Sequence, residues 1–458
     1  MEKVAALILA AGQGKRMKSG LLKVLHPIAG RPMVGYILEA TRTAGISRMV
    51  VVIGHQAEKV QEVLGSEVEY VRQKEQLGTG HAVLAAEGVI QEDLVLVLYG
   101  DTPLLDAATL RAILQRHQES GAAATVVTTE LADPTGYGRI LRNQRGGIEG
   151  IVEEKNAGEA ERQIREVNTG IVCYRRLPLF QALGKVKRDE FSGEYYLTDV
   201  VPLLLQAGYK VETFLVQDQS LVLGINTRVE LARVEKIVRQ RHLERLMLDG
   251  VTVVDPASTF VDSQVEVGMD TTLYPFTFLE GNTRIGAGCR IGPAARIVDS
   301  VLGNEVVIEQ STIEKSHLSD GVHVGPFSHL RADCFLEKGV KVGNFAEIKN
   351  TLVRSGTKIP HHSYLGDSTI GSRVNVGAGT VIVNYDGQSK HHSEIGEGAF
   401  IGCNSNLISP VRIGDGSYVA AGSTITEDVP EGALAIARGR QVNKEGWVAR
   451  SRHRAPEK

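Results

Sequence analysis

From residue 267 onward an aliphatic residue returns every six positions, and this period constrains the fold of half the chain. An amphipathic helix would need a spacing of about 3.6 residues and an ordinary strand a spacing of about two, so neither explains it. A six-residue period is typical of a β-helix, in which a tight turn follows each short strand and each coil buries its aliphatic residues on the coil below. We therefore expect a β-helix over residues 251–432. The period is carried by Val267, Leu273, Leu279, Ile285, Ile291 and Ile297, by Leu318, Val324, Leu330, Leu336, Val342 and Ile348, by Val353, Ile359 and Leu365, and by Ile395, Ile401, Leu407, Ile413, Val419 and Ile425.

The period breaks between Val383 and Glu394. An insertion into a column of coils must leave the column as a loop, and such loops often carry function. The segment contains Asn384, Tyr385 and the pair His391–His392. The paired histidines suggest zinc, but two adjacent histidines seldom bind one metal ion together.

Length and composition narrow the class of protein. A chain of 458 residues with 42% hydrophobic and 23% charged residues is expected to form two or three folded domains. The net charge of −3 gives no reason to expect nucleic-acid binding. No apolar stretch approaches the roughly 20 residues of a membrane span, so membrane insertion is not expected. The four cysteines lack CxxC spacing, which argues against a zinc ribbon and fits the cytoplasm.

The first 225 residues alternate predicted strands and helices. Continuous apolar runs at 4–10, 49–53 and 94–98 predict strands that are buried on both faces, as in a parallel sheet. Candidate helices lie at 33–44, 80–89 and 107–120. This order predicts a doubly wound, Rossmann-like α/β domain over 1–227, with ligands beyond the carboxyl ends of the strands. A charged stretch predicts a linker helix in 228–250, and the β-helix and a basic tail fill 251–458.

A glycine-rich turn follows the first predicted strand. Gly12 and Gly14 precede Arg16, and backbone N–H groups of such a turn can hold phosphate. The third glycine of a dinucleotide fingerprint is missing, because Met17 stands there. An ordinary strand-to-helix turn is the alternative.

Asp101 follows the apolar run 94–98 and is a candidate ligand of Mg²⁺, which takes one or two protein oxygens and leaves other positions to phosphate and water. The alternative is a helix N-cap.

Arg331 and Lys349 each follow a residue of the six-residue period and are one full coil apart. Both side chains should stack on one face, about 4.8 Å apart, which favours an anionic, phosphate-bearing ligand over a solvated charged face. His361 lies one coil further, and a histidine can remove a proton near neutral pH. A plain turn residue is the alternative for His361.

Together these motifs resemble the sugar nucleotidyltransferases and, in detail, the bifunctional bacterial family that joins N-acetylglucosamine-1-phosphate uridyltransferase to glucosamine-1-phosphate N-acetyltransferase. The resemblance covers essentially the whole chain. It rests on Leu9–Met17, Lys23–His26, Gln73–Ala82, Tyr99–Asp101, Gly136–Arg139, Asn168–Gly170, Gly224–Asn226 and the hexapeptide repeats. It implies a left-handed parallel β-helix and a homotrimer with an acetyl-transfer site between neighbouring β-helices, covered in part by the basic tail.

The resemblance also implies a role for individual residues. Uridine would face Leu9, Ala11, Gly12, Gln73 and Gly78, the triphosphate would meet Arg16 and Lys23, and N-acetylglucosamine would meet Gly138, Glu153 and Asn168. Ala10, Thr79, Tyr99 and Gly100 would complete the nucleotide-sugar site, and Asp101 with Asn226 would hold Mg²⁺. In the acetyltransferase half His361 would be the general base, glucosamine-1-phosphate would meet Arg331, Lys349, Tyr364 and Asn375, and acetyl-CoA would lie along Ala378, Cys403, Ala421 and Arg438. Asn384 and Tyr385 would contact these acetyl-transfer substrates.

Two residues depart from the family pattern. Leu22 stands where the family usually has proline, and Cys403 stands where it usually has serine. The expected function is acetyl transfer from acetyl-CoA to glucosamine-1-phosphate, followed by Mg²⁺-dependent uridylyl transfer from UTP. Two alternatives are a monofunctional nucleotidyltransferase with a scaffolding β-helix and a trimeric β-helix with zinc on histidines of two subunits.

Overall fold

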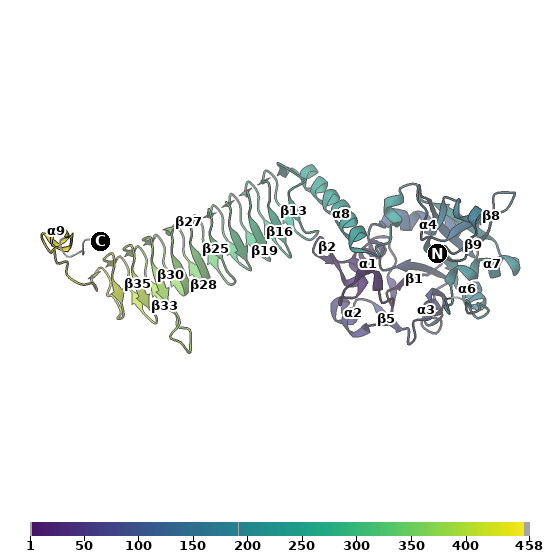
Figure 1. Cartoon of the computed structure of the whole chain (residues 1–458), viewed down its shortest axis with the longest axis horizontal. Helices are drawn as coiled ribbons and strands as arrows, with labels where there is room; N and C mark the ends of the chain where they lie inside the picture. Colours follow the sequence, from purple (N-terminus) through teal and green to yellow (C-terminus); the bar gives the residue numbers. More distant parts are fainter. Residues whose placement is uncertain (1, 191, 453–458) are drawn as a thin grey trace. The chain divides into compact units, whose positions relative to one another are not determined.

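The computed structural model describes residues 2–190 and 192–452 (Figure 1). The chain divides into two compact units, and the boundary falls between Arg239 and Gln240, inside helix α8 (Arg228–Leu248). Within the described residues, no helix is both long and apolar enough to cross a membrane.

The first unit is built on one central sheet with the strand order β11-β7-β10-β6-β1-β4-β5, and the hairpin β8–β9 extends it beside β10. The three predicted strands are confirmed as β1, β4 and β6. The sheet is mixed rather than wholly parallel, because β10 runs antiparallel to both β6 and β7. The chain reaches β10 from a hairpin and not from a crossover helix. The strands are β1 (Val4–Leu9), β4 (Arg48–Ile53), β5 (Glu69–Arg72), β6 (Leu94–Tyr99), β7 (Ala124–Glu130), β8 (Arg139–Arg142), β9 (Ile148–Val152), β10 (Glu166–Arg175) and β11 (Val211–Leu215).

The three predicted helices are present as α1 (Met33–Thr43), α3 (Thr79–Leu84) and α4 (Ala107–Ser120). Helix α3 ends earlier than predicted, and the chain continues in single turns such as Val89 N–H to the Ala86 carbonyl. Other helices are α2 (Ala57–Leu64), α5 (Glu159–Arg162), α6 (Arg176–Leu183) and α7 (Val200–Gln206). The carboxyl ends of β1 and β6 meet at one sheet edge, since Leu9 pairs with Tyr99.

The second unit is a β-helix that runs from β12 (Thr252–Val253) to β39 (Leu434–Ala435) (Figure 1). Its short strands pair in parallel with the equivalent strand of the next coil, as when Leu330 pairs with Ile348. The residues of the six-residue period form one continuous core, in which Leu273, Leu330 and Ile401 are fully buried. The predicted β-helix is confirmed.

Glycine follows the aliphatic residue because the coils leave no space there. A Cβ on Gly286 would lie 2.5 Å from the carbonyl oxygen of Gly303 in the next coil. A Cβ on Gly343 would collide with the carbonyl oxygen of Pro360 in the same way. The repeat therefore needs glycine for close packing of successive backbones.

The predicted insertion leaves the column as a loop near β33 (Ser393–Ile395) (Figure 1). The column keeps its register on both sides, because Ile370 pairs with Ile395 across the insertion and Ile395 pairs with Ile413 in the following coil. Near the carboxyl end, α9 (Trp447–Arg452) lies in the tail.

Candidate active sites

A cavity of about 590 Å³ opens beyond the carboxyl ends of β1 and β6. Most of the residues predicted for the nucleotide site line it, so the fold brings these distant motifs together. They are Leu9, Ala10, Ala11, Gly12, Lys23, Gln73, Gly78, Thr79, Tyr99, Asp101 and Asn226. Gly100, which was also predicted, does not line the cavity. It packs closely on Val24, because a Cβ on Gly100 would lie 3.1 Å from Val24 Cγ1.

One end of the cavity is cationic. Gly14 has a φ of +62°, and a Cβ there would lie 2.6 Å from Cβ of Lys23, so glycine allows the turn and Lys23 to approach. Lys23 Nζ donates to Asn226 Oδ1 at 3.0 Å, and Arg16 Nη2 donates to the same oxygen at 2.8 Å. Two cations at a glycine-rich turn suit a triphosphate.

The proposed metal ligands meet at this cationic end. Lys23 Nζ forms an ion pair with Asp101 Oδ2 and also bonds Asn226 Oδ1, so both oxygens face one positive charge. Ile225 N–H donates to the Asp101 carbonyl at 3.0 Å, which links the two ligand-bearing segments. One carboxylate and one amide oxygen are the kind of donor set that suits Mg²⁺ alongside phosphate.

The opposite end of the cavity is held by backbone contacts. Gly78 has a φ of +100°, and a Cβ there would lie 2.6 Å from the Tyr195 carbonyl oxygen. The N–H of Gly80 donates to that same oxygen at 2.8 Å. Gln73 is 4% exposed and donates from Nε2 to the Gly78 carbonyl at 3.0 Å. Close backbone contacts therefore shape this end, and Glu194 lies beside it, because a Cβ on Gly78 would also lie 2.9 Å from Cβ of Glu194.

Two of the three residues predicted for the sugar, Asn168 and Glu153, line two smaller cavities beside the main one, and Gly138 lies next to them. Tyr99 is a wall of both the main cavity and a small cavity that contains Asn168, and Ile151 joins that small cavity to one of about 380 Å³ that contains Glu153. Asn168 N–H donates to the Gly138 carbonyl at 2.8 Å. The three predicted sugar residues are therefore neighbours, but they do not line the main cavity.

Burial raises the pKa of two ionisable groups around the smaller cavities, the Glu153 carboxyl and the Tyr99 hydroxyl. The pKa of Glu153 is raised by burial, although the hydroxyl of Thr198, which donates to it at 2.9 Å, acts in the opposite direction. The pKa of the Tyr99 hydroxyl is also raised, by burial first and then by the Glu153 charge.

The sequence analysis did not single out several residues of the main cavity. The clearest is Glu194, which comes from the segment after α6. No spacing or glycine pattern marks it, because the segment reaches the site only through backbone bonds such as Tyr195 N–H to the Leu77 carbonyl at 2.8 Å. Gln13, Lys15, Gln76 and Ala82 also line the cavity.

The second candidate site is a cluster of three cations on the β-helix. Arg331 and Lys349 directly follow Leu330 and Ile348, which pair on adjacent strands in the predicted register. Lys390 from the insertion joins them and was not predicted. The pKa of Lys349 is lowered first by the contact with Lys390 and its charge, then by burial and by the charge of Arg331, while the charge of Asp367 opposes this. A cluster of this kind suits a phosphate.

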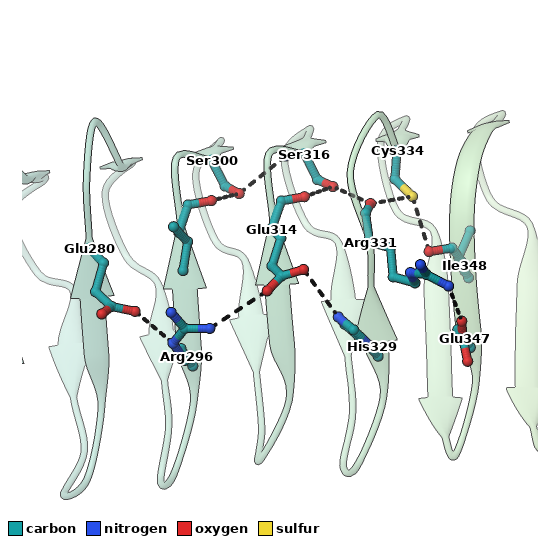
Figure 2. Close-up of polar contacts among 11 residues, drawn as sticks. Glu280, Arg296, Ser300, Glu314, Ser316, His329, Arg331, Cys334, Glu347 and Ile348 are labelled. Atoms are coloured by element: carbon teal, nitrogen blue, oxygen red, sulfur yellow. Dashed lines mark hydrogen bonds and ion pairs between the residues drawn. The ribbon is translucent and has the colours of Figure 1, made fainter.

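Neighbouring residues hold both the side chain and the backbone carbonyl of Arg331 (Figure 2). Arg331 Nη1 pairs with Glu347 Oε1 at 3.0 Å, and Ser316 Oγ and Cys334 Sγ each donate to the Arg331 carbonyl at 3.1 Å. The same face continues as a ladder of charges away from the site. In it Arg296 pairs with Glu280 at 2.6 Å and with Glu314 at 3.6 Å.

His361 is exposed at the end of β29 (Lys358–His361), and its Nδ1 lies 2.8 Å from Oδ1 of Asn344 in the preceding coil. An amide oxygen accepts, so Nδ1 carries the proton and Nε2 is left as a base. Asn344 was not predicted. Asn375 lies on the next strand of the same sheet, opposite Lys358.

The insertion places its residues against this site. Asn384 is buried, and its amide bonds Asp367 Oδ2 and lies 3.4 Å from the Tyr364 hydroxyl. Tyr385 is exposed, and its hydroxyl donates to the Gly387 carbonyl at 2.7 Å.

The paired histidines of the loop have different partners. His391 Nε2 lies 2.7 Å from Asp386 Oδ2, whereas His392 Nε2 lies 3.1 Å from Thr369 Oγ1. Across the described part of the chain, no group of three or more His, Cys, Asp or Glu side chains forms a metal centre.

The residues predicted for acetyl-CoA follow one corner of the β-helix. Asn404 N–H donates to the Ala378 carbonyl at 2.7 Å, and Gly422 N–H donates to the Cys403 carbonyl at 2.8 Å. Arg438 Nη1 then donates to the Ala421 carbonyl at 2.8 Å. Gly379 N–H bonds the His362 carbonyl at 2.8 Å, so the same corner begins beside His361. An extended ligand could follow this line of coils.

Comparison with known proteins defines the class. Residues 6–166 match the family model for the MobA-like NTP transferase domain. Residues 290–375 match the GlmU-like C-terminal hexapeptide, and residues 392–427 match the bacterial transferase hexapeptide. The chain is therefore a transferase that combines a nucleotidyltransferase domain with a hexapeptide-repeat domain.

Full-length relatives identify the family. The chain is 51% identical over 442 residues to the bifunctional protein GlmU of Carboxydothermus hydrogenoformans, which covers 96% of this chain and 99% of the relative. It is 48% identical over 449 residues to that of Caldanaerobacter subterraneus, with 98% of each chain covered. A solved structure of UDP-glucose pyrophosphorylase complexed with UDP-glucose covers 53% of this chain and all of that chain, at 20% identity and a TM-score of 0.44.

The chain belongs to the GlmU family of bifunctional proteins. It is a bifunctional enzyme that has both an acetyltransferase and a uridyltransferase activity. The interpretation of the β-helix as a scaffold alone is thereby excluded.

Proposed function

We propose that the cavity of the first unit binds UTP and N-acetylglucosamine-1-phosphate and forms UDP-N-acetylglucosamine. Uridine lies at the Gln73 and Gly78 end, the triphosphate lies at Lys23 and Arg16, and the sugar extends past Tyr99 toward Asn168 and Glu153. The observation that supports this order is the series of cavities with shared walls, which is cationic at the end where Lys23 and Arg16 lie.

The reaction needs no covalent enzyme intermediate. A phosphate oxygen of the sugar phosphate attacks the α-phosphorus of UTP, and pyrophosphate leaves. Lys23 and Arg16 neutralise phosphate charge and align the groups, so positioning and electrostatics supply most of the rate. Asp101 and Asn226 would hold Mg²⁺, which would add further neutralisation of the triphosphate. With the metal bound, Lys23 Nζ would turn from these two oxygens toward the phosphates.

The β-helix site acetylates glucosamine-1-phosphate from acetyl-CoA. Arg331, Lys349 and Lys390 bind the phosphate, and Tyr364, Asn375 and the Asn384–Tyr385 loop surround the sugar. His361 Nε2 removes a proton from the sugar ammonium so that the amine can attack the thioester carbonyl. The carbonyl carbon then releases the CoA thiolate, which takes up the second proton from the nitrogen, and Asn344 keeps His361 in the tautomer that this step needs.

The cofactor lies along the corner formed by Ala378, Cys403, Ala421 and Arg438. The Cys403 side chain is exposed and free, so it can occupy the place of a serine hydroxyl in this corner. Acetyl-CoA and UTP are co-substrates in this scheme, and a need for both supports a cytoplasmic location of the enzyme.

The active assembly is a homotrimer of β-helices. Phe327 and Phe345 stack at 5.6 Å on one corner and are 54% and 56% exposed. The next coil carries His362 at the same corner. Its N–H bonds the carbonyl of Asn344, the residue directly before Phe345. Exposed aromatic rings beside a catalytic residue suit an interface between copies. Phe327→Ser with Phe345→Ser should yield folded monomers that lose acetyl transfer and keep uridylyl transfer, and a fully active monomer would exclude this assembly.

The two-step function is tested by forming UDP-N-acetylglucosamine from glucosamine-1-phosphate, acetyl-CoA and UTP while each substrate is omitted in turn. Omission of acetyl-CoA should stop product formation, and added N-acetylglucosamine-1-phosphate should restore it. Product formed from UTP without either acetylated sugar or acetyl-CoA would contradict the proposal.

A further inference from the structure

The side-chain amide of Gln73 has only one possible orientation. One end of the amide lies 3.0 Å from the carbonyl oxygen of Gly78. A backbone carbonyl only accepts, so the amide group that faces it must be the NH₂ nitrogen. Because Gln73 is 4% exposed, its amide cannot turn toward solvent instead.

The second proton of this NH₂ group is taken by His81. Gln73 Nε2 lies 3.1 Å from His81 Nδ1, and an amide nitrogen can only donate. His81 Nδ1 must therefore be unprotonated and accept. Both amide protons are then engaged, and Gln73 has only its carbonyl oxygen, Oε1, left for a ligand in the cavity that it lines.

We propose that His81 is a positioning residue which, through Gln73, makes the enzyme select uracil over cytosine. Uracil has one donor on its pairing edge, N3–H, between two carbonyl acceptors, so an acceptor such as Oε1 can pair only with N3–H. Cytosine has an unprotonated N3 at that place, and its lone pair would face the lone pairs of Oε1. This inference rests on the proposed placement of uridine beside Gln73.

The surrounding backbone holds His81 at this distance. His81 lies in α3, and the turn before it is held by two backbone bonds, from Gly80 N–H to the Tyr195 carbonyl and from Tyr195 N–H to the Leu77 carbonyl, both at 2.8 Å. The His81 and Tyr195 rings are 6.4 Å apart between centroids. A substitution of His81 can therefore remove the acceptor while the backbone of the base site stays in place.

The test compares UTP and CTP as substrates in three proteins. His81→Phe keeps an aromatic ring but removes the acceptor, whereas His81→Asn can present Oδ1 where Nδ1 stood. The ratio of kcat/KM for UTP to kcat/KM for CTP should fall roughly ten-fold in His81→Phe, the worth of one hydrogen bond that fixes a buried amide. His81→Asn should keep most of the wild-type ratio. The helical circular-dichroism signal and the melting curve of the same preparations report folding of the first unit, and His81→Leu replaces the phenylalanine variant if that protein does not fold.

Two outcomes would overturn the proposal. One is an unchanged ratio in His81→Phe, whether or not kcat/KM falls equally with both nucleotides. The other is a loss of selectivity in His81→Asn as large as in His81→Phe. Failure of the underlying placement is recognised separately, because Gln73→Ala would then leave the KM for UTP at its wild-type value.

Discussion

Asn344 Oδ1 lies 2.8 Å from His361 Nδ1, and the two residues occupy equivalent positions of successive coils. This contact leaves His361 Nε2 as the free base of an exposed imidazole. A general base typically contributes a factor of about 10²–10⁴ in rate, so His361→Ala should lower the acetylation rate by that factor while acetyl-CoA binding changes little. Asn344→Leu should lower it about ten-fold. Steady-state acetylation at saturating substrates checks both, and near wild-type acetylation in His361→Ala would refute the assignment of the base.

Asp101 and Asn226 both contact the ammonium group of Lys23 in the structure. Substitution of either residue should affect uridylyl transfer and not acetyl transfer. Asp101→Ala should lower uridylyl transfer at least about a hundred-fold, because a metal ion contributes several kcal/mol of charge stabilisation. Acetyl transfer should be nearly unchanged. Separate assays of the two half-reactions on one preparation measure this, and equal loss of both would indicate a folding defect instead.

Lys390 comes from the insertion and should bind the same phosphate as Lys349 and Arg331. Lys390→Ala should raise the KM for glucosamine-1-phosphate about ten-fold or more, the worth of a charge-assisted hydrogen bond, with a smaller effect on kcat. Lys338→Ala removes an exposed lysine elsewhere on the β-helix and serves as the matched control. If the two variants have equal KM values, Lys390 does not contact the phosphate.

Helix α8 contributes to two separate cores. Leu231, Val234 and Val238 pack with Met17 and Ile225 of the first unit, whereas Leu243 and Leu246 pack with the core of the β-helix. A fragment of residues 1–248 should therefore fold and keep uridylyl transfer, because it retains the whole first unit. Circular dichroism and the uridylyl assay test this together. A folded fragment without activity would show that the first unit is not independent.

His242 should make the β-helix less stable in acid. It is 6% exposed, and its pKa is lowered from 6.5 to about 4, by burial first and by the charge of Arg245 second. In the unfolded chain His242 binds a proton as the pH falls below 6.5, whereas in the folded chain it does so only near pH 4. Protons therefore favour the unfolded state between these values, and the free energy of unfolding should decrease as the pH falls across this interval. His242→Leu should flatten the dependence of the melting temperature on pH. An unchanged slope in that variant would exclude His242 as the cause.

The β-helix could be predicted almost completely from the sequence, because one repeated contact between coils generates both the period and the fold. Strands β1, β4 and β6 were equally clear, since each is apolar on both faces. The direction of β10 was not, because a strand that follows a hairpin has the same composition as one that follows a crossover helix.

The residues of the candidate sites also divide into those that the sequence predicts and those that it does not. Residues in compact motifs, such as Lys23, Gln73 and Asp101, were found from the sequence. Glu194, Asn344 and Lys390 were missed because each reaches its site from a segment whose position depends on tertiary packing. The sugar residues Glu153 and Asn168 were expected beside the nucleotide, and only the structure shows that Tyr99 separates them from the main cavity.

The column of coils passes the insertion without losing its register, since Ile370 pairs with Ile395 and Ile395 pairs with Ile413. The chemistry of the loop and the mechanical continuity of the column are therefore separable. A version of the chain in which a tight turn replaces residues 384–392 should keep the same stacked core and the uridyltransferase, yet carry a catalytically silent second half. Such a chain would be a rigid column without acetyltransferase activity. If it folds, the loop at this corner can be replaced without loss of the β-helix.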